Sequence, residues 1–418
     1  MTIAEKIQKI ATDARQASIV MARLSSGAKD ELLKNMALAL INNGPHLTEE
    51  NRKDLENGER KGLSSAMLDR LMLDEQRIKA MAAGLREVAA LPDPVGEVTR
   101  MWRRPNGLQV GKMRIPLGVI GIVYEARPNV TADAAALCLK SGNSVILRGG
   151  SEAIYSNIAI ARILQGELAK LGLPTAALSV IPFTEREGVL ELLRQEEQID
   201  LIIPRGGESL IRFVVEHSKI PVIKHYKGVC HVFVDASADF AMAERIIVNA
   251  KTQRPGVCNA LETLLIHKDI AETFVPYIHE TLAGLKVELR GDETVRQFAP
   301  GVVAATEEDW QAEYLDLILA VRVVDDLDAA IDHINRYSSL HTEAIVTSDY
   351  ASAQRFLREV NSSTVLVNAS TRFADGSQLG LGAEIGISTT KLHSFGPMGL
   401  EDLTTQKFIV YGDGQIRQ

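Results

Sequence analysis

The sequence has few cysteines: three in 418 residues, placed far apart. No Cys-x-x-Cys pair occurs, and the nine histidines show no His-Glu-x-x-His spacing, so we expect no metal site. There is also no Gly-x-Ser-x-Gly motif, which leaves a serine hydrolase without support. Widely spaced cysteines argue against a disulfide scaffold and predict a reducing compartment, the cytoplasm.

Long apolar runs and excess positive charge are lacking as well. No segment approaches the roughly 20 apolar residues of a membrane span, and residues 1–18 have no apolar core typical of a secretory signal. The net charge of -8 argues against a general nucleic-acid or anionic-membrane surface. With 46% hydrophobic and 24% charged residues, the composition is that of a soluble globular protein of two or three domains.

The pattern of apolar residues predicts an α/β protein. Residues 1–92 favour helices with apolar positions three and four apart, and Leu91-Pro92 ends them. From Leu117 onwards, short strand-like runs alternate with helical stretches, and a second alternating set occupies residues 232–367. Such alternation predicts parallel, doubly wound sheets with helices on both faces. Residues 184–187 (Thr-Glu-Arg-Glu) are typical of a capping box that opens a helix.

A hairpin is predicted between the helical part and the first alternating set. Asn106-Gly107 separates two strand-like runs, and both residue types tolerate the positive φ that a tight turn requires. The hairpin has little core-type hydrophobicity, so we interpret it as an arm that pairs with another subunit. The strand-like tail at residues 406–411 is a candidate to pair with it.

Two loops after predicted strands have the composition of anion-binding loops. Residues 147–152 (Leu-Arg-Gly-Gly-Ser-Glu) and residues 203–208 (Ile-Pro-Arg-Gly-Gly-Glu) each join a strand to a helix. Glycines let the backbone approach a ligand, and a helix N-terminus favours anions. Neither loop matches a specific nucleotide motif, and simple strand-to-helix turns are the alternative for each. Two such loops in one sheet favour a dinucleotide.

Cys258 is the candidate nucleophile. Cys138 and Cys230 lie in apolar runs and are interpreted as packing residues. Cys258 instead stands in residues 253–259 (Gln-Arg-Pro-Gly-Val-Cys-Asn), a loop at the start of a strand-like run, where a thiol can be partly exposed and activated. An inert structural thiol is the alternative interpretation.

These segments together resemble the aldehyde dehydrogenase superfamily. Residues 116–123 resemble the strand that enters its cofactor domain, and residues 142–148 resemble its G-N-x-V-x-L-K segment with Arg148 at the lysine position. Residues 256–258 resemble the nucleophile loop, and residues 313–316 occupy the place of the ribose-binding E-x-F-G-P segment. The resemblance covers residues 90–418 and, more weakly, the helical N-terminus.

The closer resemblance is to one branch, the gamma-glutamyl phosphate reductases of proline biosynthesis. Three segments carry it: residues 124–131, 253–263 and 383–389. The resemblance implies an NADPH-dependent reduction of L-glutamyl 5-phosphate to L-glutamate 5-semialdehyde through a Cys258 thioester. The hairpin arm and the C-terminal strand suggest a homodimer or homotetramer, and a glutamate 5-kinase is a candidate partner that hands over the labile acyl phosphate.

The resemblance also implies a division of the chain. We expect residues 1–103 and 116–225 to form the NADPH-binding domain, and residues 226–390 to form the catalytic domain. Residues 104–115 and 391–418 are expected to form an oligomerisation arm and C-terminal strand.

Roles for individual residues follow from the same resemblance. Asn129 is the expected oxyanion donor beside the Cys258 backbone N–H, and Arg127 competes for that role. The expected cofactor contacts are Arg148, Gly149, Ser151, Gly206, Gly207 and Glu313. The expected substrate-anion contacts, each with a structural alternative, are Arg127, Arg254 and Arg372.

The sequence departs from the hydrolytic members at one position that matters for the chemistry. Where those enzymes have E-L-G-G-K, with a glutamate that activates water, residues 225–229 are His-Tyr-Lys-Gly-Val. His225 thus replaces the general base, which suits a thioester that must avoid water. The alternatives are a hydrolytic or CoA-acylating aldehyde dehydrogenase and, outside enzymes, a non-catalytic scaffold.

Overall fold

The computed structural model describes residues 1–417, which form two compact units. Unit 1 comprises Met1–Lys224, Leu381–Gly386 and Met398–Gln418, of which the last residue is not described. Unit 2 comprises His225–Gly380 and Ile387–Pro397. Segments 381–386 and 398–417 therefore pack with the first unit although they follow the second in sequence. The predicted assignment of functions to domains stays a prediction.

Unit 1 combines an N-terminal helical layer with a four-stranded sheet. Its helices are α1 (Ile3–Met21), α2 (Ser26–Asn42), α3 (Gly44–Arg60), α4 (Ser65–Leu71), α5 (Glu75–Ala90), α6 (Asn129–Lys140), α7 (Ile154–Lys170), α8 (Arg186–Leu192) and α9 (Glu208–His217). The sheet strands are β3 (Val119–Tyr124), β4 (Ser144–Arg148), β5 (Leu178–Val180) and β6 (Leu201–Arg205), in the order β5-β4-β3-β6 with parallel pairing throughout.

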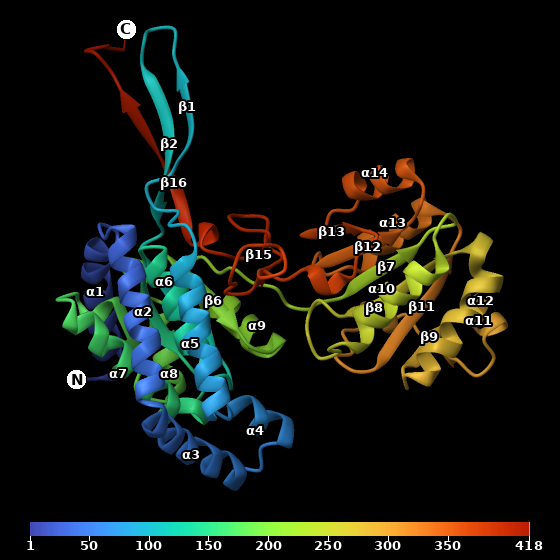
Figure 1. Ribbon diagram of the computed structural model, residues 1–418, viewed down its shortest axis with the longest axis horizontal. Coiled ribbons are helices and arrows are strands. Elements are labelled where there is room, and N and C mark those ends of the chain that lie inside the picture. Colours follow the sequence, from blue (N-terminus) through green and yellow to red (C-terminus); the bar gives the residue numbers. More distant parts are fainter. Residues whose placement is uncertain (418) are drawn as a thin grey trace. The chain divides into compact units, whose positions relative to one another are not determined.

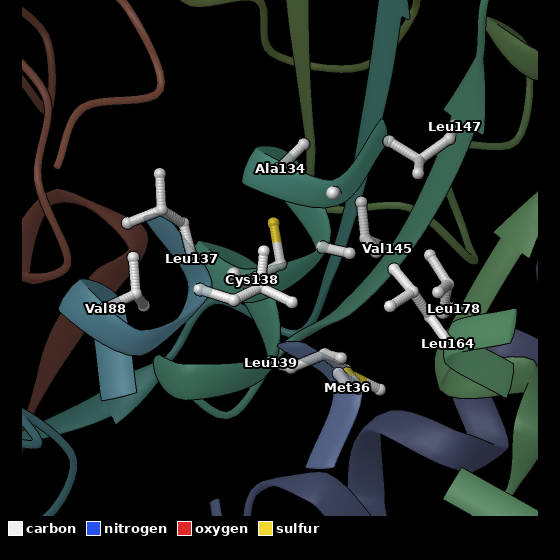
Figure 2. Packing of buried hydrophobic residues seen from close by; sticks show 14 of the residues in the cluster. Met36, Val88, Ala134, Leu137, Cys138, Leu139, Val145, Leu147, Leu164 and Leu178 are labelled. Carbon is white, nitrogen blue, oxygen red and sulfur yellow. The ribbon is translucent and has the colours of Figure 1, made fainter. Parts of the chain in front are cut away.

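Both faces of this sheet are covered, as the alternation predicts. Ile120 and Ile122 belong to a buried cluster with α2, α5, α6 and α7, whereas Val119 and Val123 belong to a second cluster with α1, α8 and α9. Cys138 lies within the first cluster, packed among leucine and valine side chains (Figure 2). Burial raises the pKa of its thiol well above the usual value, so Cys138 is a packing residue.

The predicted hairpin is confirmed and is part of a three-stranded sheet. Strands β1 (Val98–Arg103) and β2 (Gln109–Pro116) pair antiparallel around the Asn106-Gly107 turn, and Gly107 has a φ of 94°. The predicted C-terminal strand is β16 (Thr404–Tyr411), which pairs antiparallel with β2 along its whole length. This sheet projects beyond the helices of unit 1 (Figure 1).

Unit 2 contains a seven-stranded parallel sheet. Its strands are β7 (Cys230–Val234), β8 (Leu261–His267), β9 (Glu288–Gly291), β10 (Val303–Ala304), β11 (Ile318–Val324), β12 (Thr342–Val346) and β13 (Thr364–Val367), in the order β10-β9-β11-β8-β7-β12-β13. The helices are α10 (Phe240–Thr252), α11 (Lys268–Gly284), α12 (Glu293–Phe298), α13 (Leu327–Tyr337) and α14 (Tyr350–Glu359). A small antiparallel pair, β14 (Ile387–Ser388) and β15 (Gly396–Pro397), completes the unit.

Alternate residues of each central strand in unit 2 point to opposite faces. Leu264 and Ile266 pack with α10, α11 and α12, whereas Leu265 packs with α13 and α14. Both faces of the sheet are buried, which explains why these strands are continuous apolar runs.

Two local predictions were wrong. Residues 184–187 do not form a capping box, because α8 begins at Arg186 and no side chain caps it. The apolar pair Val222-Ile223 favours a further strand in the first alternating set, but the structure has only a single bridge there, between Ile202 and Val222. At both places the local structure follows the path of the backbone between the larger elements and not the short sequence pattern.

Candidate active site

Cys258 lies in a short loop between α10 and β8. We call residues 253–259 the nucleophile loop. Cys258 is partly exposed, whereas Cys138 and Cys230 are buried. Because the loop directly precedes β8, Cys258 lies near the amino-terminal ends of the parallel strands of the unit 2 sheet. The element boundary predicted from Pro255 and Gly256 is confirmed.

The backbone of Gly228 packs directly against Cys258. A Cβ atom built on Gly228 would lie 2.0 Å from the Cys258 carbonyl oxygen and 2.6 Å from its Cα. Contacts this short exclude any side chain, so only glycine fits at this position. The Gly228 N–H donates a hydrogen bond to Glu313 Oε1 at 2.9 Å. One glycine therefore contacts both Cys258, the predicted nucleophile, and a predicted cofactor residue.

Cys230 holds the same carbonyl group from another direction. Its Sγ donates to the Cys258 carbonyl oxygen at 3.2 Å, and it lies 3.7 Å from His341 Nδ1. Burial lowers the pKa of His341 to about 3 with a contribution from His225, and burial raises that of Cys230. The interpretation of Cys230 as a packing residue was incomplete, because its thiol also fixes the nucleophile loop.

Arg372 is bound to both ends of the nucleophile loop. Its Nε donates to Gln253 Oε1 at 2.9 Å, and its Nη1 donates to Asn259 Oδ1. Burial lowers the pKa of Arg372, and the neighbouring charge of Arg254 lowers it further, whereas Cys258 acts in the opposite direction. Two cations of the predicted substrate set thus lie within electrostatic range of each other, and Arg372 is within range of the thiol.

Asn259 is itself held rigidly, so the position of Arg372 is well defined. Its Nδ2 donates to the Ala374 carbonyl at 3.0 Å, and its own carbonyl accepts from Thr371 Oγ1 at 2.7 Å. The segment that carries Arg372 is therefore fastened to the nucleophile loop at three points. A cation fixed in this way stabilises negative charge on the sulfur or on a bound anion.

His225 lies within the same unit as the thiol. Its ring is edge-on to that of His341, with 5.9 Å between the ring centroids. His341 in turn contacts Cys230, so the three side chains form a row toward the nucleophile loop. The role of His225 stays a prediction.

The predicted cofactor residues of unit 1 gather at the end of its sheet. Arg148 ends β4 and is paired in register with Val123, while Tyr124 at the end of β3 is paired with Arg205. The loops after β4 and β6 therefore flank β3 at the carboxyl edge of a parallel sheet. Open α/β sheets bind ligands at this edge.

The surroundings of Arg148 fit a phosphorylated ligand. Its guanidinium donates to the carbonyl groups of Gly149 and Thr184 at 2.7 and 2.9 Å, and burial lowers its pKa. The charges of Glu152 and Glu185 act on that pKa in the opposite direction, and the Arg148 Nε is buried without a hydrogen-bond partner among residues 1–417. A half-buried guanidinium with an unsatisfied donor is suited to a phosphate group.

The backbone of Gly149 packs against Asn157. A Cβ atom on Gly149 would lie 2.1 Å from Asn157 Nδ2, and this amide nitrogen is also buried without a partner among the described residues. Two unsatisfied donors, one on Arg148 and one beside Gly149, are suited to a polar ligand. The residues present therefore fit the nucleotide expected here.

The second glycine loop is shaped by Glu125. Its Oε2 accepts from the Gly207 N–H at 2.9 Å and would lie 2.4 Å from a Cβ atom on Gly206. Similarly, Glu152 Oε1 accepts from the Ala126 N–H at 2.6 Å. The loops are thus tied together by carboxylates that sequence reasoning did not single out.

The remaining predicted residues of unit 1 are exposed. Arg127, Asn129 and Ser151 all have exposed side chains, and Asn129 Nδ2 donates to Asp133 Oδ2 at 2.9 Å. Burial raises the pKa of Asp133 to about 6. The assignments of Asn129 and Arg127 to an oxyanion site stay predictions.

Other candidate sites were sought in the same chain. Within residues 1–417, no three His, Cys, Asp or Glu side chains gather as metal ligands, and no helix is both long and apolar enough to cross a membrane. A crevice of about 440 Å³ opens at the carboxyl end of β11, beside Arg322 and His333. None of the predicted site residues lines it.

The family is identified by comparison with known proteins. The model of the aldehyde dehydrogenase family matches residues 2–312, and the chain belongs to that family. Members typically use NAD or NADP as cofactor. An acetylating aldehyde dehydrogenase of Geobacillus thermoglucosidasius shares the fold, with a TM-score of 0.69 at 16% identity over 100% of this chain and 98% of its own.

Relatives within the family are more specific. Gamma-glutamyl phosphate reductase of Geobacter metallireducens is 82% identical over 100% of both chains, and that of Xanthomonas campestris is 58% identical over 98% of this chain and 99% of its own. The crystal structure of the Thermotoga maritima enzyme of that name matches with a TM-score of 0.97 and 46% identity, over 99% of this chain and 100% of that one. The chain therefore belongs to the gamma-glutamyl phosphate reductases, and the predicted resemblance and fold class are confirmed.

Sequence reasoning found the thiol, the arginines and the glycine loops but missed the residues that hold them. Gln253 and Glu262 lie within residues 253–263, a segment that carries the resemblance, but the resemblance assigned them no role. For Gly228 the only signal is a glycine just before a buried strand. Its contact with Cys258 joins positions 30 residues apart and requires the fold.

Replacing Gly228 by alanine tests the close contact with the nucleophile. We expect Gly228→Ala to displace the Cys258 backbone and to lower turnover by about 100-fold, because misplacing a reacting group by about 1 Å costs that much. The alkylation rate of Cys258 by iodoacetamide should change as well.

Gly256→Ala is the matched control within the same loop. The nearest atom to its Cβ would be the Leu315 carbonyl oxygen at 3.7 Å, an ordinary contact, so it should cost far less. Equal activity losses in the two variants would contradict the role of the Gly228 contact.

Proposed function

We propose that this protein reduces L-glutamyl 5-phosphate to L-glutamate 5-semialdehyde with NADPH and releases phosphate, the second step of proline biosynthesis from glutamate. The observation that carries the proposal is a partly exposed cysteine whose loop is locked by Gly228, Cys230 and Arg372. The relatives that share the whole chain bear the name of this activity.

The proposed reaction proceeds through covalent catalysis by Cys258. Its thiolate attacks the acyl carbon, a C–S bond forms, the C–O bond to phosphate breaks, and phosphate leaves. NADPH, when bound, supplies the hydride that reduces the thioester carbonyl. The oxyanion then collapses, the C–S bond breaks, and the thiolate is restored with release of the aldehyde. Sulfur suits both steps because it is a strong nucleophile and a good leaving group.

Donors for the oxyanion and partners for the substrate anions come from residues already described. The Cys258 backbone N–H is the first proposed oxyanion donor, and the side chain of Asn129 or Arg127 is the second. Arg372 and Arg254 are proposed to bind the phosphate or carboxylate groups of the substrate. The hydrogen bonds from Arg372 to Gln253 and Asn259 support this role because they hold its guanidinium near the thiol.

Exclusion of water is the feature that separates this reaction from aldehyde oxidation by hydrolysis. No carboxylate replaces the missing base in residues 225–229, where the sequence is His-Tyr-Lys-Gly-Val. Glu313 is engaged by the Gly228 N–H, so it is not proposed to activate water. The thioester is therefore proposed to exchange between phosphate and hydride only.

The cofactor is proposed to be NADPH rather than NADH. Support comes from Arg148, a half-buried cation whose Nε has no hydrogen-bond partner among the described residues. Gly149, Ser151, Gly206 and Gly207 are proposed to contact the nucleotide through their backbone. Glu313 is proposed to contact its nicotinamide ribose.

The arm is proposed to join subunits in a homodimer or homotetramer. Its three-stranded sheet exposes large apolar side chains, among them Phe408, Val410 and Tyr411. Exposed apolar strands of this kind are suited to pairing with a second copy. We also propose a cytoplasmic location, with three free cysteines, and a glutamate 5-kinase as a partner.

Phosphate dependence tests the proposed reaction. In the reverse direction, with L-glutamate 5-semialdehyde and NADP, reduction of NADP should require phosphate, because only phosphate releases the acyl group from the thioester. Arsenate should support turnover in its place. The measurement is NADPH absorbance with and without each anion. Steady NADP reduction without either anion would instead show a hydrolytic aldehyde dehydrogenase.

Replacement of Arg148 tests the choice of nucleotide. Arg148→Ala should weaken NADPH binding by about 10- to 100-fold, since a charge-assisted phosphate contact is worth roughly 1.5–3 kcal/mol, and should leave NADH binding nearly unchanged. Binding is measured by nucleotide fluorescence. Arg162→Ala, an exposed substitution on α7, is the control. Equal losses for both nucleotides would remove Arg148 from the role.

A further inference from the structure

Two contacts place the segment Glu313–Leu315 beside the nucleophile loop, one of them through Gly228. Glu313 Oε1 accepts from the Gly228 N–H at 2.9 Å, and Gly228 packs against the Cys258 backbone. The Leu315 carbonyl oxygen lies 3.7 Å from the position of a Cβ atom on Gly256. The segment that carries Glu313, the proposed ribose contact, therefore lies next to the nucleophile loop.

Leu315 has a backbone conformation that must be held in place. Its φ is 56°, in the left-handed region that residues other than glycine rarely adopt. The Leu315 N–H donates to Glu262 Oε1 at 3.2 Å. This hydrogen bond fixes the amide of the residue that faces Gly256.

Glu262 is fixed in turn by a buried ion pair. Its Oε2 lies 2.7 Å from Lys251 Nζ, and both side chains are 0% exposed. Lys251 is in the last turn of α10 and Glu262 is the second residue of β8, so the pair joins the two ends of the nucleophile loop. Glu262 thus binds Lys251 beside that loop through Oε2 and binds the Leu315 N–H of the neighbouring segment through Oε1.

Stability alone gives a weak reason for such a pair. Removing two charges from water costs about as much as their attraction returns, and a well-packed apolar pair often serves as well. Burial raises the pKa of Glu262 to about 7 despite Lys251, which reflects that cost. The segment also has another anchor, because Tyr314 donates to Asp309 Oδ1 at 2.7 Å. What Glu262 adds is the placement of Leu315 beside the nucleophile loop.

We propose that Glu262 is a positioning residue for hydride transfer, with Lys251 as its counter-charge. Through Leu315 it fixes the segment that carries Glu313, and it thereby sets the nicotinamide ribose contact relative to Cys258. The proposal rests on the proposed function, because it concerns the alignment of NADPH with the thioester. Glu262 touches neither the thiol nor the substrate and acts through Leu315.

Two double variants isolate the hydrogen bond to Leu315. Lys251→Met with Glu262→Gln removes both charges and keeps an acceptor oxygen, whereas Lys251→Met with Glu262→Leu removes the acceptor as well. The readouts are the first-turnover rate of NADPH formation, the affinity for NADPH by fluorescence, and the rate of Cys258 alkylation by iodoacetamide. The two chains have the same charge and nearly the same side-chain volume.

We expect the Leu chain to form NADPH about 10- to 100-fold more slowly than the Gln chain, since losing the support of an aligned group costs about this much. Cys258 alkylation should differ less than about twofold between them. Equal first-turnover rates would overturn the proposal. Alkylation that falls in parallel with turnover would also overturn it, because the pair would then only stabilise the nucleophile loop.

A backbone variant keeps the proposal testable if the Leu chain fails to fold. Replacing Leu315 by its α-hydroxy acid through codon suppression exchanges the N–H donor for an ester oxygen while keeping every side chain, and it should slow the first turnover to a similar degree. An unchanged rate would overturn the proposal. A wild-type enzyme without phosphate-dependent turnover would contradict the proposed function instead, whatever the variants show.

Discussion

The candidate active site depends on the packing of one backbone against another, at Gly228 and Cys258. The carbonyl group of Cys258 faces a glycine that leaves no room for a side chain, and it also accepts a hydrogen bond from Cys230. Arg372 binds the loop at Gln253 and Asn259, and Lys251 pairs with Glu262 across its base. The Cys258 backbone is therefore fixed by contacts to its carbonyl group and to the neighbouring residues of the loop.

The same contacts account for the kind of reaction proposed. A cysteine that forms a thioester needs a fixed position, a nearby cation and a surrounding without an activated water. Arg372 is the proposed cation, and His225 is predicted to stand where a hydrolytic enzyme has its glutamate. Glu313, a carboxylate near the loop, accepts a hydrogen bond from the Gly228 N–H. The acyl group is therefore proposed to pass only between phosphate and hydride.

The sequence predicted much of the fold, because the central strands are short apolar runs buried on both faces. The apolar runs at residues 119–124, 261–267 and 364–367 form strands β3, β8 and β13, and the Asn106-Gly107 hairpin pairs with the C-terminal strand as expected. The predicted capping box at residues 184–187 was wrong because α8 begins later. Apolar residues that repeat every 2 positions in strands or every 3.6 positions in helices mark the buried face reliably. Short motifs at helix ends depend instead on the backbone path around them.

The site was only partly predictable for a related reason. Cys258 was singled out by its loop context and assigned as nucleophile through the resemblance, and Arg372 was singled out by its charge; both roles stay predictions. The residues that hold them, Gly228, Asn259 and Glu262, act through contacts between positions distant in sequence or through one backbone group. No local pattern marks a glycine that touches a carbonyl 30 positions away, so the fold was needed to find it.

The most direct test of the central claim is to observe the acyl-enzyme. The protein is mixed with L-glutamate 5-semialdehyde and NADP without phosphate, quenched in acid, and digested for mass spectrometry. The account predicts one equivalent of NADPH and a glutamyl thioester on the peptide that contains Cys258, which phosphate added before the quench removes. A full burst with no adduct, or an adduct on another residue, would contradict it.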